Sequence, residues 1–295
     1  MQQHVAQTPD SRLRIPGDNI SVGGVELEYW VKGAGEPVVF LHGGVLTDWF
    51  GPLAGELSRT GSYRIVSYNR PAYGSSTPPS QPITIAGQAD CCLALMRHLG
   101  IAKAHLVGHS IGACIALQAA LQEPEAVVSV ALLEPPILAA TSDPSPALTV
   151  LRASAALWKQ GDVAGAMDAF MRGIVDPDYE LVLDRVLGTW REDALKGTDA
   201  FFRNDQPALQ AWGFDRSEAA LVRQPAILFL GENSTQVNPI REPIHATLLS
   251  WLPNAEGHTV EGASHLLPLQ KPSQISALLT AFYNARITAQ NHWDG

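Results

Sequence analysis

Ser110 stands between two glycines, in the Gly-His-Ser-Ile-Gly segment of residues 108–112. An apolar run, residues 104–107, precedes this segment, and a stretch of helix-compatible composition, residues 113–121, follows it. A strand, a sharp turn and a helix in this order form the context in which a Gly-x-Ser-x-Gly motif makes a nucleophile elbow. Such a turn lifts the serine hydroxyl clear of the sheet and points a backbone N–H at the reacting oxygen. We therefore predict that Ser110 is a catalytic nucleophile; the alternative is a Gly-flanked turn that serves geometry alone.

A serine hydroxyl is a poor nucleophile near neutral pH and needs a neighbouring base. The chain has nine histidines, and His265 is the best placed of them. Its loop follows the last predicted strand and precedes the last predicted helix, so it opens at the same edge of a parallel sheet as Ser110. We expect His42 and His109, which lie beside the glycine loop described next and inside the elbow, to be structural.

An oxyanion hole needs preorganised N–H donors where negative charge develops during the reaction. Gly43 and Gly44 follow the apolar run of residues 38–41, and two glycines let a backbone approach a substrate closely. We expect the N–H groups of Gly44 and Ile111 to be the donors. The alternative is an ordinary Gly-Gly turn.

The predicted elements place these residues along one edge of a sheet. Apolar and polar residues alternate in residues 19–22 and 25–32, and a Gly-Gly pair separates the two runs, which indicates a β-hairpin. Further apolar runs then alternate with helical stretches, which predicts a mostly parallel sheet covered on both faces. The predicted strands after the hairpin are residues 37–41, 63–68, 104–107, 126–133, 226–230 and 256–260, and the predicted helices are residues 49–58, 83–99, 111–122, 240–251 and 272–289.

In the order of these motifs the chain resembles the α/β-hydrolase superfamily, from about residue 22 to residue 285. The glycine loop, the elbow around Ser110 and the loop that ends at His265 match in order. The resemblance implies the α/β-hydrolase fold, an α/β fold whose mostly parallel central sheet has helices on both faces and an inserted helical lid. It is specific for the fold and weak for the substrate.

Residues 69–76 resemble the superfamily's Asp-x-Pro-Gly-x-Gly-x-Ser turn. Here Asn69 and Ala72 replace the Asp and the first Gly. The turn is structural in the superfamily, so we expect this departure to affect packing more than chemistry.

The alternation of strands and helices breaks between Pro135 and Gln224, where only helical patterns recur. We predict a helical lid of residues 136–224, inserted into a core made of residues 19–135 and 225–290. The aromatic residues of the lid suggest an apolar or aromatic substrate group. Trp158, Trp190 and Trp212 are candidate substrate-binding residues, and for each the alternative is that it packs the lid onto the core.

The acid of the triad is where the sequence departs from most relatives that it resembles. The resemblance places this acid after residues 226–230 in a Gly-x-x-Asp turn, but here Ser234 occupies the Asp position. A serine cannot act as the anionic partner of an imidazolium, although the reaction benefits from a carboxylate that orients the histidine.

Glu134 is the substitute that we predict. It ends the apolar run of residues 128–133, directly before two prolines, and a carboxylate buried there without a partner would cost several kcal/mol. A subset of the superfamily, including some haloalkane dehalogenases and the zearalenone-type lactonases, resembles this arrangement and has its acid after the same strand. The alternatives are Glu232 as the acid, a dyad without an acid, an inactive site, or a capping role for Glu134 at the start of the lid.

The predicted order along the chain, Ser110, Glu134 and His265, is that of this fold. Dehalogenases and epoxide hydrolases of the fold use Asp at the elbow, so Ser110 favours acyl chemistry. We predict a carboxylic ester hydrolase, esterase-like or lactonase-like, that works through an acyl-enzyme on Ser110. Two alternatives remain: a carbon–carbon bond (diketone) hydrolase with the same triad, and a non-catalytic ligand-binding or receptor module.

The composition narrows the possible partners. The formal net charge is −9, and the 20 Lys and Arg residues form no run, which argues against nucleic-acid binding. None of the three cysteines has a second Cys or His at zinc-ligand spacing, so we expect neither a disulfide framework nor a metal site. No phosphate loop or dinucleotide glycine fingerprint is present, so no cofactor is implied. A small-molecule ester or lactone is the expected partner, and the oligomeric state stays open.

The apolar runs are short. None approaches the ~18–20 residues that span a bilayer, and residues 1–18 lack the apolar centre of a signal peptide. We expect a cytoplasmic protein that does not enter a membrane and whose first dozen residues are frayed.

Overall fold

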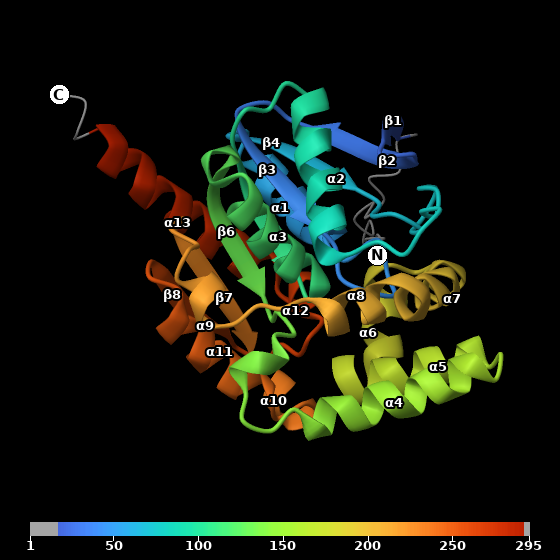
Figure 1. Ribbon diagram of the computed structural model, residues 1–295. Coiled ribbons are helices and arrows are strands. Elements are labelled where there is room, and N and C mark those ends of the chain that lie inside the picture. The colour runs from blue at the N-terminus through green and yellow to red at the C-terminus, as the bar shows by residue number, and fades with distance from the viewer. Residues whose placement is uncertain (1–16, 292–295) are drawn as a thin grey trace, which may run out of the picture.

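The computed structural model describes residues 17–291, with side chains described to residue 285. The dozen residues predicted to be frayed lie outside this range. The frame of the protein is one sheet in the order β1-β2-β4-β3-β5-β6-β7-β8 (Figure 1). Its strands are β1 (Asp18–Val22), β2 (Val25–Lys32), β3 (Glu36–Leu41), β4 (Tyr63–Tyr68), β5 (Ala104–His109), β6 (Val127–Leu133), β7 (Ala226–Gly231) and β8 (Ala255–Val260).

The opening strands form the predicted hairpin. Val22 pairs with Val25, and the two turn residues Gly23 and Gly24 have φ values of 57° and 83°. Positive φ at both central positions is the geometry of the tight turns that match the twist of a hairpin. β2 then pairs antiparallel with β4, while every later neighbouring pair, from β3–β4 to β7–β8, is parallel. The prediction of a mostly parallel sheet is confirmed.

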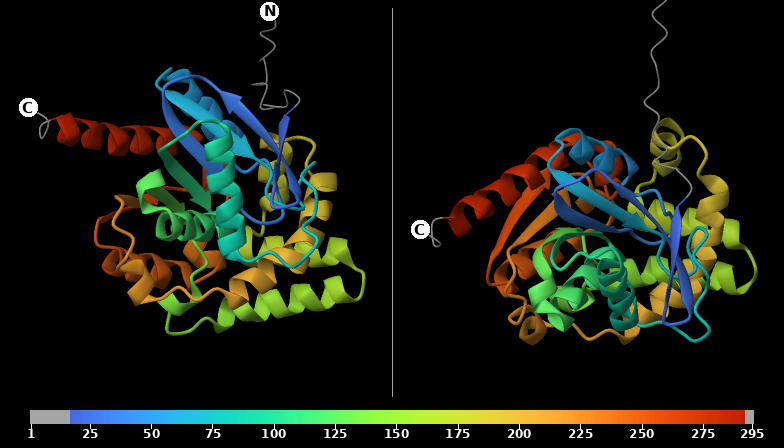
Figure 2. Two further views of the ribbon diagram at one scale, coloured as in Figure 1. Left: turned by 45° about the horizontal axis from the view of Figure 1, so that its top comes forward. Right: turned by 90° about the horizontal axis from the view of Figure 1, so that it is seen from above.

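Helices cover both faces of this sheet. α1 packs against α13 on one face and α2 packs against α3 on the other (Figure 2). All residues of β5 and β7 are buried, as expected for central strands covered on both sides. Among the described residues no helix is long and apolar enough to cross a membrane. The helices outside the predicted lid are α1 (Gly51–Arg59), α2 (Ile85–His98), α3 (Ile111–Gln122), η1 (Pro124–Ala126), α10 (Ser234–Val237), α11 (Arg241–Trp251), α12 (Leu267–Gln270) and α13 (Pro272–Asn291).

The segment predicted to be a lid contains helices joined by loops, with no strand among its residues, and lies beyond the carboxyl ends of β6 and β7 (Figure 1). The division of the chain into core and lid stays a prediction. The helices of this segment are η2 (Leu138–Ala140), α4 (Ser145–Lys159), α5 (Val163–Phe170), the π-helix η3 (Met171–Val175), α6 (Tyr179–Val186), α7 (Arg191–Ala200), the π-helix η4 (Phe201–Asp205), α8 (Gln206–Ala211) and α9 (Arg216–Ala219).

Candidate active site

Ser110 occupies a strained turn between β5 and α3. Its φ of 53° and ψ of −124° lie in a region that non-glycine residues rarely adopt, at a cost of about 1–3 kcal/mol. The Ser110 N–H donates to the carbonyl of Leu133 over 2.8 Å, which ties the turn to the end of β6. A Cβ atom at Gly112 would lie only 1.9 Å from the carbonyl oxygen of Leu41, so the chain requires glycine there. The turn leaves Ser110 partly exposed between two fully buried neighbours.

Glu134 and His265 meet at the carboxyl edge of the sheet. Glu134 Oε2 lies 2.5 Å from His265 Nδ1, and Glu134 Oε1 accepts a hydrogen bond of 2.7 Å from the Gly231 N–H. Both side chains are buried. Glu232, the alternative acid, is exposed and accepts a hydrogen bond from the Gly262 N–H instead. The structure therefore brings Glu134, and not Glu232, to His265.

The charges around this pair fix its protonation. Burial raises the pKa of Glu134, but the charge of Arg241 and the hydrogen bond with His265 outweigh burial and hold the pKa at about 2. Burial and the charge of Arg241 lower the pKa of His265 to about 4, against the opposing effect of Glu134. At neutral pH the carboxylate is ionised and the imidazole is neutral, which is the state that a general base requires.

Ser110, Glu134 and His265 line one cavity of about 460 Å³. Among the described residues no hydrogen bond joins the Ser110 hydroxyl to His265. Catalytic hydrogen bonds are often long without substrate and tighten in the Michaelis complex, so the shared cavity is the informative observation. His109 supports His265 from behind, because its Nε2 lies 2.9 Å from the His265 carbonyl oxygen and the two ring centroids are 4.4 Å apart.

The N–H groups of the two predicted oxyanion donors have no hydrogen-bond acceptor among the described residues. Neither the Gly44 N–H nor the Ile111 N–H donates a hydrogen bond to another described residue. Ile111 begins α3, where the first N–H groups of a helix lack internal partners and carry partial positive charge. Neither residue is among those that line the 460 Å³ cavity; Phe201, which does line it, would lie 2.6 Å from a Cβ atom at Gly44.

A buried arginine that the sequence analysis missed holds the glycine loop. The Arg70 guanidinium donates to the carbonyl oxygens of His42 and Gly43, over 3.1 and 2.9 Å, and Arg70 is fully buried. It also forms an ion pair of 2.7 Å with Asp205, a residue of the predicted lid that accepts a further hydrogen bond from Tyr73. This network connects the loop of Gly44 to η4.

Arg241 is a second residue that the sequence analysis missed. Its Nη1 lies 2.5 Å from Glu134 Oε2 and 2.5 Å from His265 Nδ1, and its Nη2 donates to the carbonyl oxygen of Ile174. Arg241 is 7% exposed and lines the same cavity as Ser110. The sequence offers one indirect signal for Arg241. Because Glu134 after β6 takes the predicted role of the acid, the segment after β7 is free to contribute another charged side chain.

Known proteins match the chain over most of its length. A family model described as the alpha/beta hydrolase family matches residues 38–278. The chain belongs to the α/β hydrolase family. This confirms the resemblance that the motifs indicated.

Three individual relatives share 22–38% of their residues with this α/β hydrolase over the aligned regions. The dihydrolipoyllysine-residue acetyltransferase component of the acetoin cleaving system of Cupriavidus necator is 38% identical over 120 residues, which are 39% of this chain and 30% of that relative. The uncharacterized carboxylesterase nap of Bacillus subtilis is 25% identical over 256 residues, 84% of this chain and 79% of the relative. The crystal structure of the enol-lactonase from Burkholderia xenovorans LB400 has a TM-score of 0.77 at 22% identity, covering 90% of this chain and all of that one. The last likeness shows the fold.

Of the three tryptophans predicted to bind substrate, the hydrolase brings only Trp212 to the cavity of Ser110. Trp158 stacks on Phe202, with ring centroids 5.8 Å apart, and donates its indole N–H to Asp199 within the predicted lid. Trp190 is buried and donates its indole N–H to Asp184. Trp158 and Trp190 thus make their contacts within the predicted lid, and their alternative interpretation, that they pack the lid onto the core, stays a prediction.

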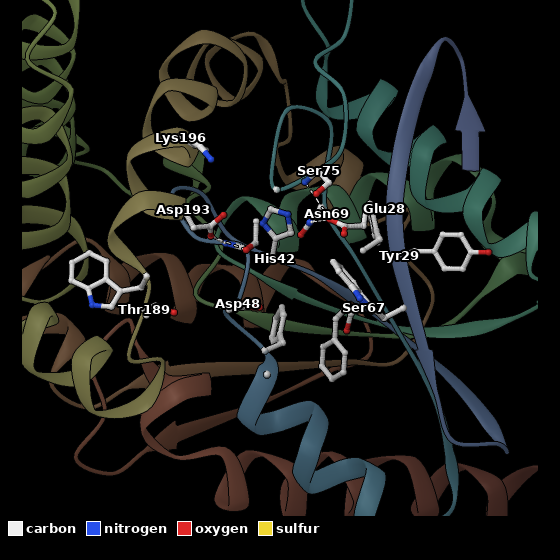
Figure 3. A pocket seen from close by; sticks show the side chains of 18 of the residues that line it. Glu28, Tyr29, His42, Asp48, Ser67, Asn69, Ser75, Thr189, Asp193 and Lys196 are labelled. Atoms are coloured by element: carbon white, nitrogen blue, oxygen red, sulfur yellow. Dashed lines mark hydrogen bonds between the residues drawn. The ribbon is translucent and has the colours of Figure 1, made fainter. Parts of the chain in front are cut away.

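Trp190 instead lines a second cavity of about 880 Å³, between the N-terminal hairpin and α7 (Figure 3). In this cavity Asn69 donates a hydrogen bond of 2.7 Å to Glu28, and Asp193 of α7 accepts one of 2.7 Å from Thr47. An Asp in place of Asn69 would set two carboxylates against each other. The departure of residue 69 from the superfamily's turn therefore has a packing explanation, as expected.

Proposed function

We propose that this α/β hydrolase cleaves a carboxylic ester or lactone through an acyl-enzyme on Ser110. The observation that supports the proposal is the buried Glu134–His265 pair, with an ionised carboxylate and a neutral imidazole, in the same cavity as Ser110. A serine nucleophile, a neutral base and an orienting acid are the components of acyl transfer.

In the proposed reaction, His265 takes the proton of the Ser110 hydroxyl as the serine oxygen attacks the carbonyl carbon. The N–H groups of Gly44 and Ile111 stabilise the oxyanion that forms. The intermediate then collapses, and His265 gives its proton to the leaving alcohol or to the alkoxide of the opened lactone. Water, deprotonated by His265, attacks the acyl-enzyme and releases the acid together with free Ser110. Glu134 remains ionised and orients His265 throughout.

The relatives lend this reaction class support. One relative is named a carboxylesterase, and the fold is shared with an enol-lactonase and with a protein described as an N-acyl homoserine lactone degrading enzyme. Serine rather than Asp at the elbow favours acyl chemistry, because the Asp of dehalogenases forms an ester with an alkyl carbon.

The test replaces Ser110 with alanine and measures hydrolysis of p-nitrophenyl esters. We expect turnover to fall by about 10⁴-fold or more, the size of loss seen when a triad serine is removed. Ser250→Ala is the matched control, because Ser250 is exposed at the end of α11 and away from the cavity. Equal turnover by Ser110→Ala and the wild type would refute the scheme.

A substrate panel separates the alternatives. Lactones and diketones, assayed beside the esters, distinguish ester hydrolysis from carbon–carbon bond hydrolysis by the same residues. A ligand-binding module would label slowly with a fluorophosphonate probe or stop after one turnover, whereas a hydrolase turns over steadily.

A further inference from the structure

The cavity of Ser110 contains a permanent positive charge in a mainly apolar wall. Arg241 is the one Lys or Arg among the described residues that line it. Its neighbours in the wall include the lid residues Leu148, Leu151, Phe170 and Ile174. A guanidinium stays charged at any physiological pH, so this charge has to be balanced within the cavity.

Glu134 balances the charge of Arg241, but the same carboxylate oxygen of Glu134 also contacts His265. Arg241 Nη1, His265 Nδ1 and Glu134 Oε2 form a triangle in which each edge is 2.5 Å. If Nδ1 carries the proton and donates to Glu134, it faces the N–H donors of Arg241. If Nδ1 is unprotonated and accepts from Arg241, it faces the carboxylate without a proton between them. No single tautomer satisfies all three edges, so the guanidinium opposes the histidine tautomer that catalysis needs.

The guanidinium also has unused donors. Of its five N–H groups, Nη1 contacts Glu134 and His265 and Nη2 donates to the carbonyl of Ile174, while Nε is buried and has no hydrogen-bond partner among the described residues. A planar fork of N–H groups matches the two oxygens of a carboxylate. The conflict over the His265 tautomer therefore disfavours the contact of Arg241 with Glu134, and the guanidinium has the geometry to bind another anion.

The other titratable groups around the cavity leave this role to Arg241. Asp215 is exposed and Glu218 is half-buried, and both are engaged with the backbone at the start of α9, where they form a capping box. Burial lowers the pKa of His245, so this histidine is neutral at pH 7. Burial likewise holds the pKa of His109, behind His265, well below its usual value.

We propose that Arg241 binds a carboxylate carried by the ester or lactone substrate, and that this carboxylate draws the guanidinium away from the Glu134–His265 pair. The inference rests on the proposed function. It assigns a substrate class, esters or lactones that bear a free carboxylate at a distance from the scissile carbonyl. It also makes the anion a condition of full activity, because binding frees Nδ1 of His265 to donate to Glu134 alone.

The kinetic test compares two esters that differ in one charge, mono-p-nitrophenyl glutarate and its methyl ester. A charge-assisted hydrogen bond is worth a factor of about ten to a hundred, so we expect the wild type to favour the anionic ester by that factor in kcat/KM. Arg241→Met should remove the preference, because methionine has neither the charge nor the N–H donors that bind the carboxylate. Arg241→Lys, which keeps the charge without the fork, should retain part of the preference. Arg152→Met, an exposed change on α4 outside the cavity, is the control and should keep all of it.

A binding test is independent of turnover. Calorimetry on Ser110→Ala should show monomethyl glutarate binding at least about tenfold more tightly than dimethyl glutarate. Adding Arg241→Met should remove the difference.

The outcomes separate the two proposals. If the wild type hydrolyses both esters equally and Ser110→Ala binds both ligands equally, the carboxylate site is refuted while the ester hydrolase stands. If Arg241→Met slows both esters by the same factor, Arg241 positions Glu134 and binds no substrate, which also refutes the site. If neither ester is hydrolysed in a manner that depends on Ser110, the proposed function itself fails.

Discussion

Glu134 and His265, separated by 131 residues, are in direct contact, with Oε2 2.5 Å from Nδ1. The contact depends on an unusual backbone, since Glu134 has a φ of 49° at the end of β6. This conformation is rare for residues other than glycine and costs about 1–3 kcal/mol. It turns the side chain toward β7, where the Gly231 N–H holds the second carboxylate oxygen.

The first prediction concerns this carboxylate. Glu134→Gln should reduce kcat for a p-nitrophenyl ester by at least about a hundredfold, because His265 loses the group that fixes its tautomer and stabilises its charge. The change also leaves Arg241 buried without a counter-charge, so activity is to be measured well below the unfolding temperature of the variant.

Glu232→Gln is the matched control. Its amide oxygen can still accept from Gly262, and Glu232 makes no contact with His265, so turnover should stay close to that of the wild type. The reverse pattern, with Glu232→Gln impaired and Glu134→Gln active, would show that Glu232 and not Glu134 is the acid of the triad.

The second prediction concerns the pH dependence of turnover. The base acts when it is neutral, so the rate rises with pH through the pKa of His265, about 4 in the folded protein. Arg241 is a cause of that low value, and Glu134, with a pKa of about 2, stays ionised throughout. Arg241→Met should therefore move the acidic limb of the kcat/KM profile for a neutral ester upward by about one unit or more, toward 6.5. A limb at the same pH in both proteins would show that Arg241 does not act on His265.

The third prediction concerns the buried ion pair between the core and η4. Asp205→Asn should lower the free energy of unfolding by about 3–5 kcal/mol, because Arg70 would be left buried with an uncompensated charge. Glu123→Gln, which breaks the exposed pair with Arg97, should cost at most about 1 kcal/mol. Urea unfolding measures both changes, and equal losses in the two variants would contradict the role given to Arg70.

The fourth prediction concerns the elbow. Gly112→Ala should lower the free energy of unfolding by about 3 kcal/mol. The new methyl group would overlap the carbonyl oxygen of Leu41, and a backbone atom cannot move aside as easily as a side chain. Gly55→Ala, in α1 with no atom within 4 Å of the new Cβ, should be neutral or stabilising by up to about 1 kcal/mol. Thermal unfolding followed by circular dichroism compares the two variants, and a Gly112→Ala protein as stable as Gly55→Ala would mean that the turn is not tightly packed.

The elements that position the candidate site were predictable because their signals are local. Apolar runs and helical stripes gave the strands and helices to within two residues in most cases, and the residues 111–122 predicted as a helix are those of α3. The position of Glu134 followed from a carboxylate that needed a partner at the end of a buried strand.

The contacts of Arg241 and of the tryptophans were not predictable, because each depends on segments far apart in the chain. The site of Arg241 is completed by Ile174 and Glu134, 67 and 107 residues away. Composition alone does not tell which face of a lid helix Trp158 or Trp190 occupies. Their indole N–H groups are satisfied by acidic residues within the lid, which holds both rings away from the cavity of Ser110.

The position of Glu134 directly after β6 has a practical consequence for protein engineering. His265 draws its carboxylate from β6, so the segment after β7 is released from supplying one and contributes Asn238, Ile240 and Arg241 to the cavity wall. Asn238 and Ile240 form a compact target for a mutant library, because both line the cavity and, among the described residues, neither side chain is hydrogen-bonded to the serine, the histidine or their acid.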